Sequence, residues 1–289
     1  MAELRVSVVV CTYSMSRWES LRASVASVEA LSPFEIIVVV DHCPELADRC
    51  HRSFSVMVLE SSEPPGLSGA RNAGVRACAG DVVAFVDDDA VVDRQWLSLL
   101  IRSYSDESVS GVGGCVEPMW NGGRPAWFPP EFDWVVGCSH SGMPRELAAV
   151  RNLIGTNMSF RTSVLRESGG FRTSLGRRGD RLLFGEETEL CIRIGGTLLY
   201  DPRARVRHHV PVARQTVRYF VTRCFGEGLS KARITRLVGA GRGLADERAH
   251  VRRTLPRALA RATPARFAAI LGGLAVTALG YAAGLASRR

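Results

Sequence analysis

The sequence predicts an α/β protein with a mostly parallel sheet between helices. Short runs rich in Val and Ile alternate with segments whose apolar residues recur at helical spacing. Strands of a parallel sheet have such continuous apolar runs, because helices cover both faces of the sheet. Polar residues end several of these runs, and ligands bind at that edge of such sheets. The N-terminal part is therefore expected to be a nucleotide-binding type of α/β unit.

The expected elements follow one another in a regular order. Strands are predicted for LRVSVVVC, FEIIVVVD, SVMVLES and DVVAFVDDD, at 4–11, 34–41, 55–61 and 81–89. Each is a short apolar run without internal Pro or Gly, as expected of a buried strand. Helices are predicted for 18–31, 66–78 and about 93–104, where apolar residues recur every three or four positions.

The first turn excludes a dinucleotide-dependent dehydrogenase. Asp41 ends the second strand, where such enzymes hold the ribose of the cofactor. However, CTYSMSRW after the first strand contains no GxGxxG to hold a pyrophosphate. The glycines of GLSGARNAG come two strands too late for that role.

Charge and hydropathy divide the chain into three parts. Residues 1–202 carry 19 Lys+Arg and 26 Asp+Glu, whereas residues 203–266 carry 16 and 3. Residues 267–286 are uncharged, and about 20 such residues suffice for a helix to cross a bilayer. We therefore expect an α/β catalytic domain over 1–212, basic amphipathic helices over 213–263 and an apolar, membrane-inserted helix over 264–289.

The basic region favours a membrane over nucleic acid as its partner. It lacks the interleaved aromatics and the motifs of nucleic-acid modules. Arginines before an apolar segment favour the cytoplasmic side and anionic headgroups. The N-terminus does not resemble a signal peptide, and the eight cysteines lack zinc-type spacing, which suits a reducing cytoplasm. We expect a protein at the cytoplasmic face of the cell membrane, its apolar segment either spanning the bilayer or lying on it.

Three consecutive aspartates, Asp87, Asp88 and Asp89, follow the fourth strand. Their charges repel one another, and capping of the next helix would explain only one of them. Mg²⁺ and Mn²⁺ prefer oxygen ligands and often take one or two carboxylates together with substrate phosphates. The triplet therefore predicts a divalent cation.

Six motifs occur in the order seen in family 2 glycosyltransferases with the GT-A fold, which the chain resembles over about residues 5–230. They are VVVCTY, the acid of VVVDHCP, GLSGARNAG, FVDDD, GTNMSFR and GEETELCIR. The resemblance implies an inverting enzyme that uses a nucleotide-sugar donor, a UDP-sugar being favoured, and a divalent cation, Mn²⁺ or Mg²⁺. With the apolar tail, it points to an acceptor hydroxyl on a lipid-linked or envelope glycan.

The resemblance also implies a set of donor contacts. Thr12, Tyr13 and Asp41 match positions that contact the base and ribose. Arg71 matches a basic position near the donor, the alternative being an ion pair with an aspartate at a strand end. Asn157 is the expected sugar contact. The full set of donor residues is Thr12, Tyr13, Asp41, Arg71, Asp87, Asp88, Asn157 and Arg214.

Metal and base are assigned in the same way. Asp89 with Asp87 and His208 would hold the metal, with His209 as the neighbouring alternative to His208. Inverting transfer needs a base to deprotonate the acceptor hydroxyl. In the family this base is usually the Asp of a Glu-Asp pair at a helix start. Glu187 occupies that position, one methylene longer, and Glu186 is the alternative base.

Two other interpretations stay open. A polyprenyl-phosphate sugar synthase would need no base, because its acceptor phosphate is already an anion. A non-catalytic carbohydrate-binding or scaffold protein could use the same fold. Trp120, Trp127 and Trp134 lie in a Pro- and Gly-rich stretch, where they either form a sugar-stacking platform or anchor the loop.

Overall fold

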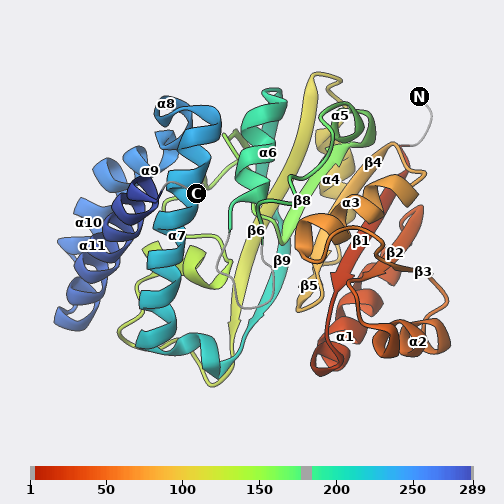
Figure 1. The fold of residues 1–289 in the computed structure, drawn as a ribbon, viewed down its shortest axis with the longest axis horizontal. Helices are drawn as coiled ribbons and strands as arrows, with labels where there is room; N and C mark the ends of the chain where they lie inside the picture. The colour runs from red at the N-terminus through yellow and green to blue at the C-terminus, as the bar shows by residue number, and fades with distance from the viewer. Residues whose placement is uncertain (1–3, 177–183, 288–289) are drawn as a thin grey trace.

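The computed structural model describes residues 4–176 and 184–287. Within these residues nine strands form one sheet, in the order β3-β2-β1-β4-β8-β6-β9-β5, with β7 paired to β9 (Figure 1). Helices cover the sheet on both faces, and the C-terminal helices stand beside it. The α/β sandwich predicted from the sequence is confirmed.

The first four predicted strands form a parallel unit. They are β1 (Val6–Thr12), β2 (Glu35–Val40), β3 (Met57–Glu60) and β4 (Val82–Asp87). β1 pairs in parallel with both β2 and β4, and β2 with β3. Their carboxyl ends therefore meet at one edge of the sheet, where Thr12 and Asp87 lie.

The later strands make the sheet as a whole mixed. They are β5 (Ala90–Val92), β6 (Val109–Trp120), β7 (Ala148–Ala149), β8 (Asn157–Arg161) and β9 (Thr197–Val210). β8 is antiparallel to both β4 and β6, and β5 and β7 are antiparallel to β9, whereas β6 and β9 are parallel. The parallel arrangement expected from the sequence thus describes the N-terminal half of the sheet.

Alternating side chains of the strands contact helices on opposite faces. Val8 packs with α4 (Trp96–Ser103), and Val10 with α1 (Trp18–Glu29) and α2 (Pro44–Ser53). Val9 faces the other way, toward α3 (Leu67–Ala77), α5 (Thr162–Glu167) and α6 (Glu186–Ile194). This alternation is the period-two pattern of strands buried on both faces.

The C-terminal helices share a core with the end of the sheet. They are α7 (Val217–Val238), α8 (Ala240–Gly243), α9 (Ala245–Ala249), η4 (His250–Thr254), α10 (Leu255–Leu259) and α11 (Pro264–Ala286). Short helices η1 (Met15–Arg17), η2 (Pro130–Val136) and η3 (Val212–Gln215) complete the described elements. Val210, Phe220 and Ile270 belong to one apolar cluster, so all three expected parts of the chain contribute to the same core.

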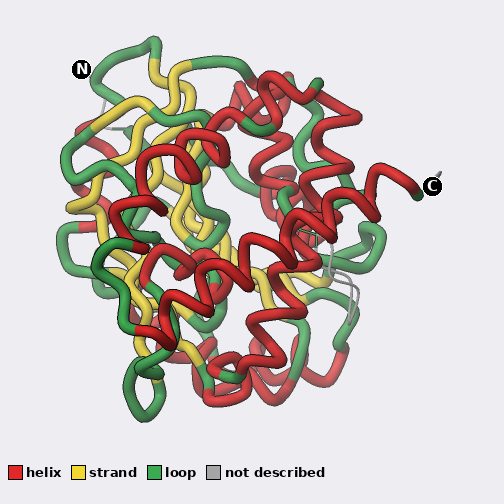
Figure 2. The backbone as a smooth tube through the Cα atoms, turned by 90° about the vertical axis from the view of Figure 1, so that its left-hand side faces the viewer, coloured by secondary structure: helices red, strands yellow, loops and turns green. Residues whose placement is uncertain are grey.

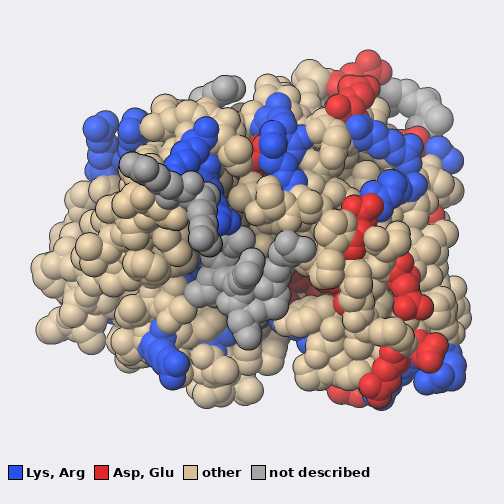
Figure 3. Space-filling model, viewed as in Figure 1, with Lys and Arg blue, Asp and Glu red and all other residues tan. Residues whose placement is uncertain are grey.

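Helix α11 is the one helix in the described part of the chain that is long and apolar enough to cross a membrane. It runs beside α7, and Figure 2 shows the long helices crossing in front of the strands. Acidic side chains gather over the parallel strands on the right of Figure 3, whereas the left-hand surface, over α7 and α11, is mostly uncharged.

Candidate active site

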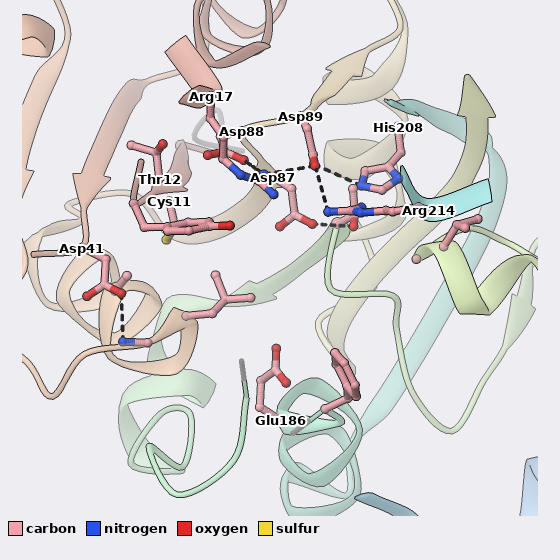
Figure 4. Close-up of a pocket in the computed structure, with 18 of the residues that line it drawn as sticks. Cys11, Thr12, Arg17, Asp41, Asp87, Asp88, Asp89, Glu186, His208 and Arg214 are labelled. Carbon is pink, nitrogen blue, oxygen red and sulfur yellow. Dashed lines mark hydrogen bonds and ion pairs between the residues drawn. The ribbon is translucent and has the colours of Figure 1, made fainter. Parts of the chain in front are cut away.

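A pocket opens at the carboxyl ends of the parallel strands (Figure 4). Asp89, His208 and Arg214 lie along one side of it, and Glu186 lies on the opposite side. Most of the residues assigned to a site from the sequence line it, namely Thr12, Tyr13, Asp41, Asp87, Asp88, Asp89, Glu186, His208 and Arg214.

Asp87, Asp89 and His208 form a cluster of three metal-type ligands. Each offers an atom, and these atoms all lie within 4.8 Å of one another. Strand pairing explains the meeting of residues so distant in sequence. β5 pairs antiparallel with β9 so that Ala90 faces His208, and the His209 N–H donates to the Asp89 carbonyl at 2.9 Å. This register turns His208 toward the aspartates.

Three basic side chains surround the Asp89 carboxylate. His208 Nε2 lies 3.0 Å from Oδ1, while Arg17 Nη1 lies 3.0 Å and Arg214 Nη2 3.6 Å from Oδ2. Burial alone would raise the pKa of Asp89, but His208, Arg17 and Arg214 together hold it well below its usual range. Asp89 is thus ionised on this side of the pocket.

Asp88 is more deeply buried than its neighbours. Its side chain pairs with Arg17 through Oδ1, yet its Oδ2 is buried without a hydrogen-bond partner, as is Thr12 Oγ1, among the residues that the structure describes. Burial raises the pKa of Asp88 although Arg17 opposes the shift. Both residues belong to the pocket wall, and the Thr12 hydroxyl also opposes the rise in the pKa of Asp88.

Sequence reasoning missed Arg17. It ends η1, directly after the first strand and its turn, and it lines the pocket. Its guanidinium contacts both Asp88 and Asp89 and lies 5.0 Å from the centre of the Tyr13 ring. The one signal in the sequence was a lone arginine shortly after the polar end of a strand.

Asp41 and Tyr13 form the far end of the pocket. Asp41 Oδ2 accepts a hydrogen bond from the Gly66 N–H at 2.8 Å, and its Oδ1 lies 2.7 Å from His42 Nδ1. These contacts fix the carboxylate, while the Tyr13 side chain is 46% exposed and free to meet a planar ring. The expected base- and ribose-contacting residues therefore lie together.

Arg71 lies beneath the pocket wall and makes the ion pairs that were the alternative interpretation. Nη1 lies 2.8 Å from Glu186 Oε1, and Nη2 lies 3.5 Å from Asp87 Oδ1. The guanidinium is 2% exposed. Arg71 thus connects Asp87 at the end of β4 with Glu186 at the start of α6. It is not among the residues that line the pocket, where a contact with the donor was expected.

Asn157 is also displaced from its expected role. It is fully buried, and its Oδ1 accepts from Trp96 Nε1 at 2.8 Å while its Nδ2 donates to the Cys115 and Ala204 carbonyls. The preceding residue, in the turn that leads into β8, faces the pocket instead. Thr156 lines it and donates to Asp87 Oδ2 at 2.7 Å.

Glu186 and Glu187 begin α6 after Gly185, whose φ of 88° is readily adopted by glycine. Glu186 faces the pocket and Arg71. Glu187 is half-buried next to it and is not among the residues that line the pocket, and a backbone N–H donates a hydrogen bond to its carboxyl group. Burial and the neighbouring charge of Glu186 raise the pKa of Glu187 well above the usual range of a carboxyl group. A carboxylate of this kind suits proton transfer.

Helix α7 supplies another wall of the pocket, through Tyr219 and Arg223. The Arg223 guanidinium lies over the Phe184 ring, 3.3 Å from its centre. The tryptophans singled out in the sequence do not line the pocket. Trp120, Trp127 and Trp134 pack edge-on or tilted against phenylalanines, so they anchor their loop.

Comparison with known families agrees with this geometry. The model of glycosyl transferase family 2 matches residues 7–169, which is more than half of the chain. The chain belongs to glycosyl transferase family 2. It is therefore a glycosyltransferase, and the non-catalytic interpretation falls away. A relative from Haloferax volcanii, named glucosyl-dolichyl phosphate glucuronosyltransferase, is 39% identical over 239 residues, which are 79% of this chain and 76% of the relative.

Solved structures share the fold of this family 2 enzyme. A mannosyltransferase from Pyrobaculum calidifontis, solved with GDP-Man and Mn²⁺, matches with a TM-score of 0.63 and 18% identity, covering 98% of this chain and 88% of that one. GalNAc-T7, solved with UDP, GalNAc and Mn²⁺, matches with a TM-score of 0.54 and 21% identity, covering 72% of this chain and 43% of that one. The expected GT-A fold is confirmed.

Proposed function

We propose that this family 2 enzyme is an inverting, metal-dependent glycosyltransferase. It would move a sugar from a nucleotide-sugar, a UDP-sugar foremost, to a hydroxyl of a lipid-linked envelope glycan at the cytoplasmic face of the membrane. The observation that carries the proposal is the division of the pocket. The Tyr13–Asp41 end, the cluster of Asp87, Asp89 and His208, and Glu186 at the start of α6 are separate groups facing one space.

The cluster fits a divalent cation. Two carboxylates and one imidazole are ligands of Mn²⁺, and the imidazole favours Mn²⁺ over Mg²⁺ because nitrogen ligands suit transition metals. Asp87, Asp89 and His208 would hold the cation, which when bound neutralises charge on the departing nucleotide. Solved relatives of this fold that contain Mn²⁺ support the assignment.

Other side chains would bind the donor and deprotonate the acceptor. Tyr13 would stack on the base, and Asp41, already fixed by Gly66, would accept from the base or a ribose hydroxyl. Arg17 and Arg214 lie beside the aspartates and would pair with the donor phosphates, since a guanidinium matches phosphate geometry. Glu187 would take the proton of the acceptor hydroxyl as it attacks, because Arg71 already occupies Glu186.

Two observations support a lipid-linked acceptor. The name of the Haloferax relative contains glucosyl-dolichyl phosphate, a lipid-linked sugar. In this chain, α7 carries Tyr219 and Arg223 into the pocket and packs along the apolar helix α11. An acceptor held in a bilayer would therefore meet the pocket from the side of these helices.

A thermal-shift screen of nucleotide-sugars with Mn²⁺ tests the donor and the metal together. We expect one donor to raise the unfolding temperature, and Asp89→Asn to abolish that rise. Asp93→Asn is the matched control, because Asp93 pairs with Arg207 outside the pocket. Equal stabilisation of the wild-type and Asp89→Asn proteins would refute the metal assignment.

A further inference from the structure

The contact between α7 and α11 is close and continuous. The two helices run parallel, because Phe220 lies against Gly273 and Gly228 against Thr277 and Gly280. A Cβ placed on Gly228 would lie 2.2 Å from the Thr277 carbonyl oxygen, and one on Gly284 would lie 2.6 Å from the Ala232 Cβ. Small residues let the two backbones touch, so α11 is packed along the body of the enzyme over most of its length.

Both ends of α11 are also tied to that body. At its start, Arg266 Nε donates to the Ala126 carbonyl at 3.0 Å. At its end, Arg236 of α7 donates to the carbonyls of Gly284, Leu285 and Ser287 at 2.7 to 2.8 Å. The last carbonyls of a helix lack partners within the helix, and a cation there also suits the helix dipole. A guanidinium of the catalytic body thus holds the C-terminal end of α11.

The outward face of α11 carries no polar side chain. Every exposed position from 264 to 286 is Pro, Ala, Gly, Leu or Phe. Phe267, Leu271, Leu279 and Leu285 are 43 to 64% exposed, and Val221 and Phe225 extend the surface onto α7. We call these six residues the apolar face. Six exposed apolar side chains on two neighbouring helices indicate a surface that meets a partner.

We propose that the apolar face lies in the plane of an anionic bilayer surface and that α11 does not span the membrane. If α7 accompanied α11 across the bilayer, it would carry Arg223, Glu227 and Lys231 into it, at a high cost for charged groups. If α11 crossed alone, it would leave Arg236 and expose the glycine contacts and the Phe220 ring. A helix lying in the interface keeps all these contacts and still buries its outer face.

Charge beside the apolar face selects the bilayer as its partner. The exposed residues Arg252, Arg253, Arg257 and Arg261 lie on or next to η4 and α10, and α10 contacts α11. Arginines at this position would meet the headgroups of anionic lipids, each adding to the attraction. The inference deepens the membrane association within the proposed function, and its tests measure binding and position rather than sugar transfer.

Vesicle flotation tests the surface. The full chain is mixed with vesicles of phosphatidylglycerol and phosphatidylcholine, or of phosphatidylcholine alone. We expect binding that favours the anionic vesicles and falls at least about tenfold in the double variant Leu271→Glu/Leu279→Glu, because burial of two leucines is lost. Met57→Glu is the matched control, since Met57 is 44% exposed on β3, far from α11. Donor-induced thermal stabilisation in every variant would show that the fold is kept.

A topology experiment separates the in-plane helix from a spanning one. An epitope tag after residue 289 is followed in sealed inside-out vesicles from cells that express the full chain. Protease added outside the vesicles should digest both the tag and the catalytic body, because an in-plane α11 leaves both on the outer side of the vesicle membrane. A protected tag beside a digested catalytic body would overturn the proposal. So would flotation of the double variant that equals that of the wild-type protein.

Discussion

The Asp89 carboxylate contacts three basic side chains, those of Arg17, His208 and Arg214. A metal ion would compete with them for this carboxylate. Arg17 Nη1 lies 3.0 Å from Asp89 Oδ2, so a cation held by this carboxylate would lie close to the guanidinium. Opposite charges this close attract strongly in a partly buried site. Arg17 is therefore a competitor that must move before a metal ion takes that oxygen.

We expect Arg17→Gln to bind Mn²⁺ several-fold more tightly than wild type in the absence of donor, because the competing cation is gone. Titration calorimetry with Mn²⁺ alone measures this directly. Arg22→Gln is the matched control, since Arg22 is exposed on α1 and pairs with Glu19. Unchanged or weaker Mn²⁺ binding in Arg17→Gln would show that the guanidinium does not compete for Asp89.

Glu187 gives a prediction of pH dependence. Burial and Glu186 raise its pKa, and a base acts only in its deprotonated form, so kcat should rise with pH until that raised pKa is passed. Glu187→Gln should lower kcat by about 10² to 10⁴ and remove this acidic limb, as a lost general base does. Glu186→Gln, which frees Arg71, is the comparison. Nearly full transfer by Glu187→Gln would favour a polyprenyl-phosphate sugar synthase over our base assignment.

The sequence could indicate which acids belong to the site, but not which side chains reach it. The aspartate triplet 87–89 and the distant His208 were recognisable from the order and spacing of the motifs, and they lie together in the structure. Asn157 is buried against Trp96 while its neighbour Thr156 lines the pocket, and which of the two faces the pocket depends on where β8 begins. Arg17 could not be found, since its contact with Asp88 depends on how η1 turns after β1.

Among the elements, the α7–α11 contact predicts opposite effects at two glycines of one helix. A Cβ on Gly280 would lie 2.2 Å from the Phe225 carbonyl oxygen, whereas a Cβ on Gly272 meets nothing within 4 Å. Gly280→Ala should destabilise the protein by about 1–3 kcal/mol through overpacking. Gly272→Ala should stabilise it by about 0.5–1 kcal/mol, the helix propensity difference.

Denaturant unfolding of the two alanine variants and the wild type, in the same detergent, provides the measurement. Equal stability of the two variants would mean that α11 does not pack on α7 in solution.

The hydrophobic pattern of the sequence predicted only part of the sheet. β1, β2 and β3 are neighbours joined by local βαβ units, whose order and direction follow from short connections, and β4 returns to pair in parallel with β1. β8 lies between β4 and β6 although β6 precedes it in the chain, and that insertion depends on pairing between distant segments. The hydrophobic pattern cannot encode such pairing, so the antiparallel part of the sheet was not foreseen.

For the whole molecule, the shared core predicts that the C-terminal part cannot be removed cleanly. Ile270 is buried beside Phe132 and Phe220, and Gly273 touches both rings. A chain ending at residue 263 should therefore unfold at a markedly lower temperature or aggregate, even in detergent. Thermal unfolding followed by circular dichroism checks this. An unchanged midpoint would instead support an apolar segment over 264–289 that folds independently of the catalytic body.

Helix α7 contributes Val221 and Phe225 to the apolar face and Tyr219 and Arg223 to the pocket. An enzyme seated on the bilayer through this helix would search for its acceptor in two dimensions. Its rate would then follow the mole fraction of acceptor among the lipids and not the acceptor concentration in the whole sample. Dilution of the vesicles in buffer would leave turnover unchanged, whereas dilution of the acceptor with inert lipid would slow it.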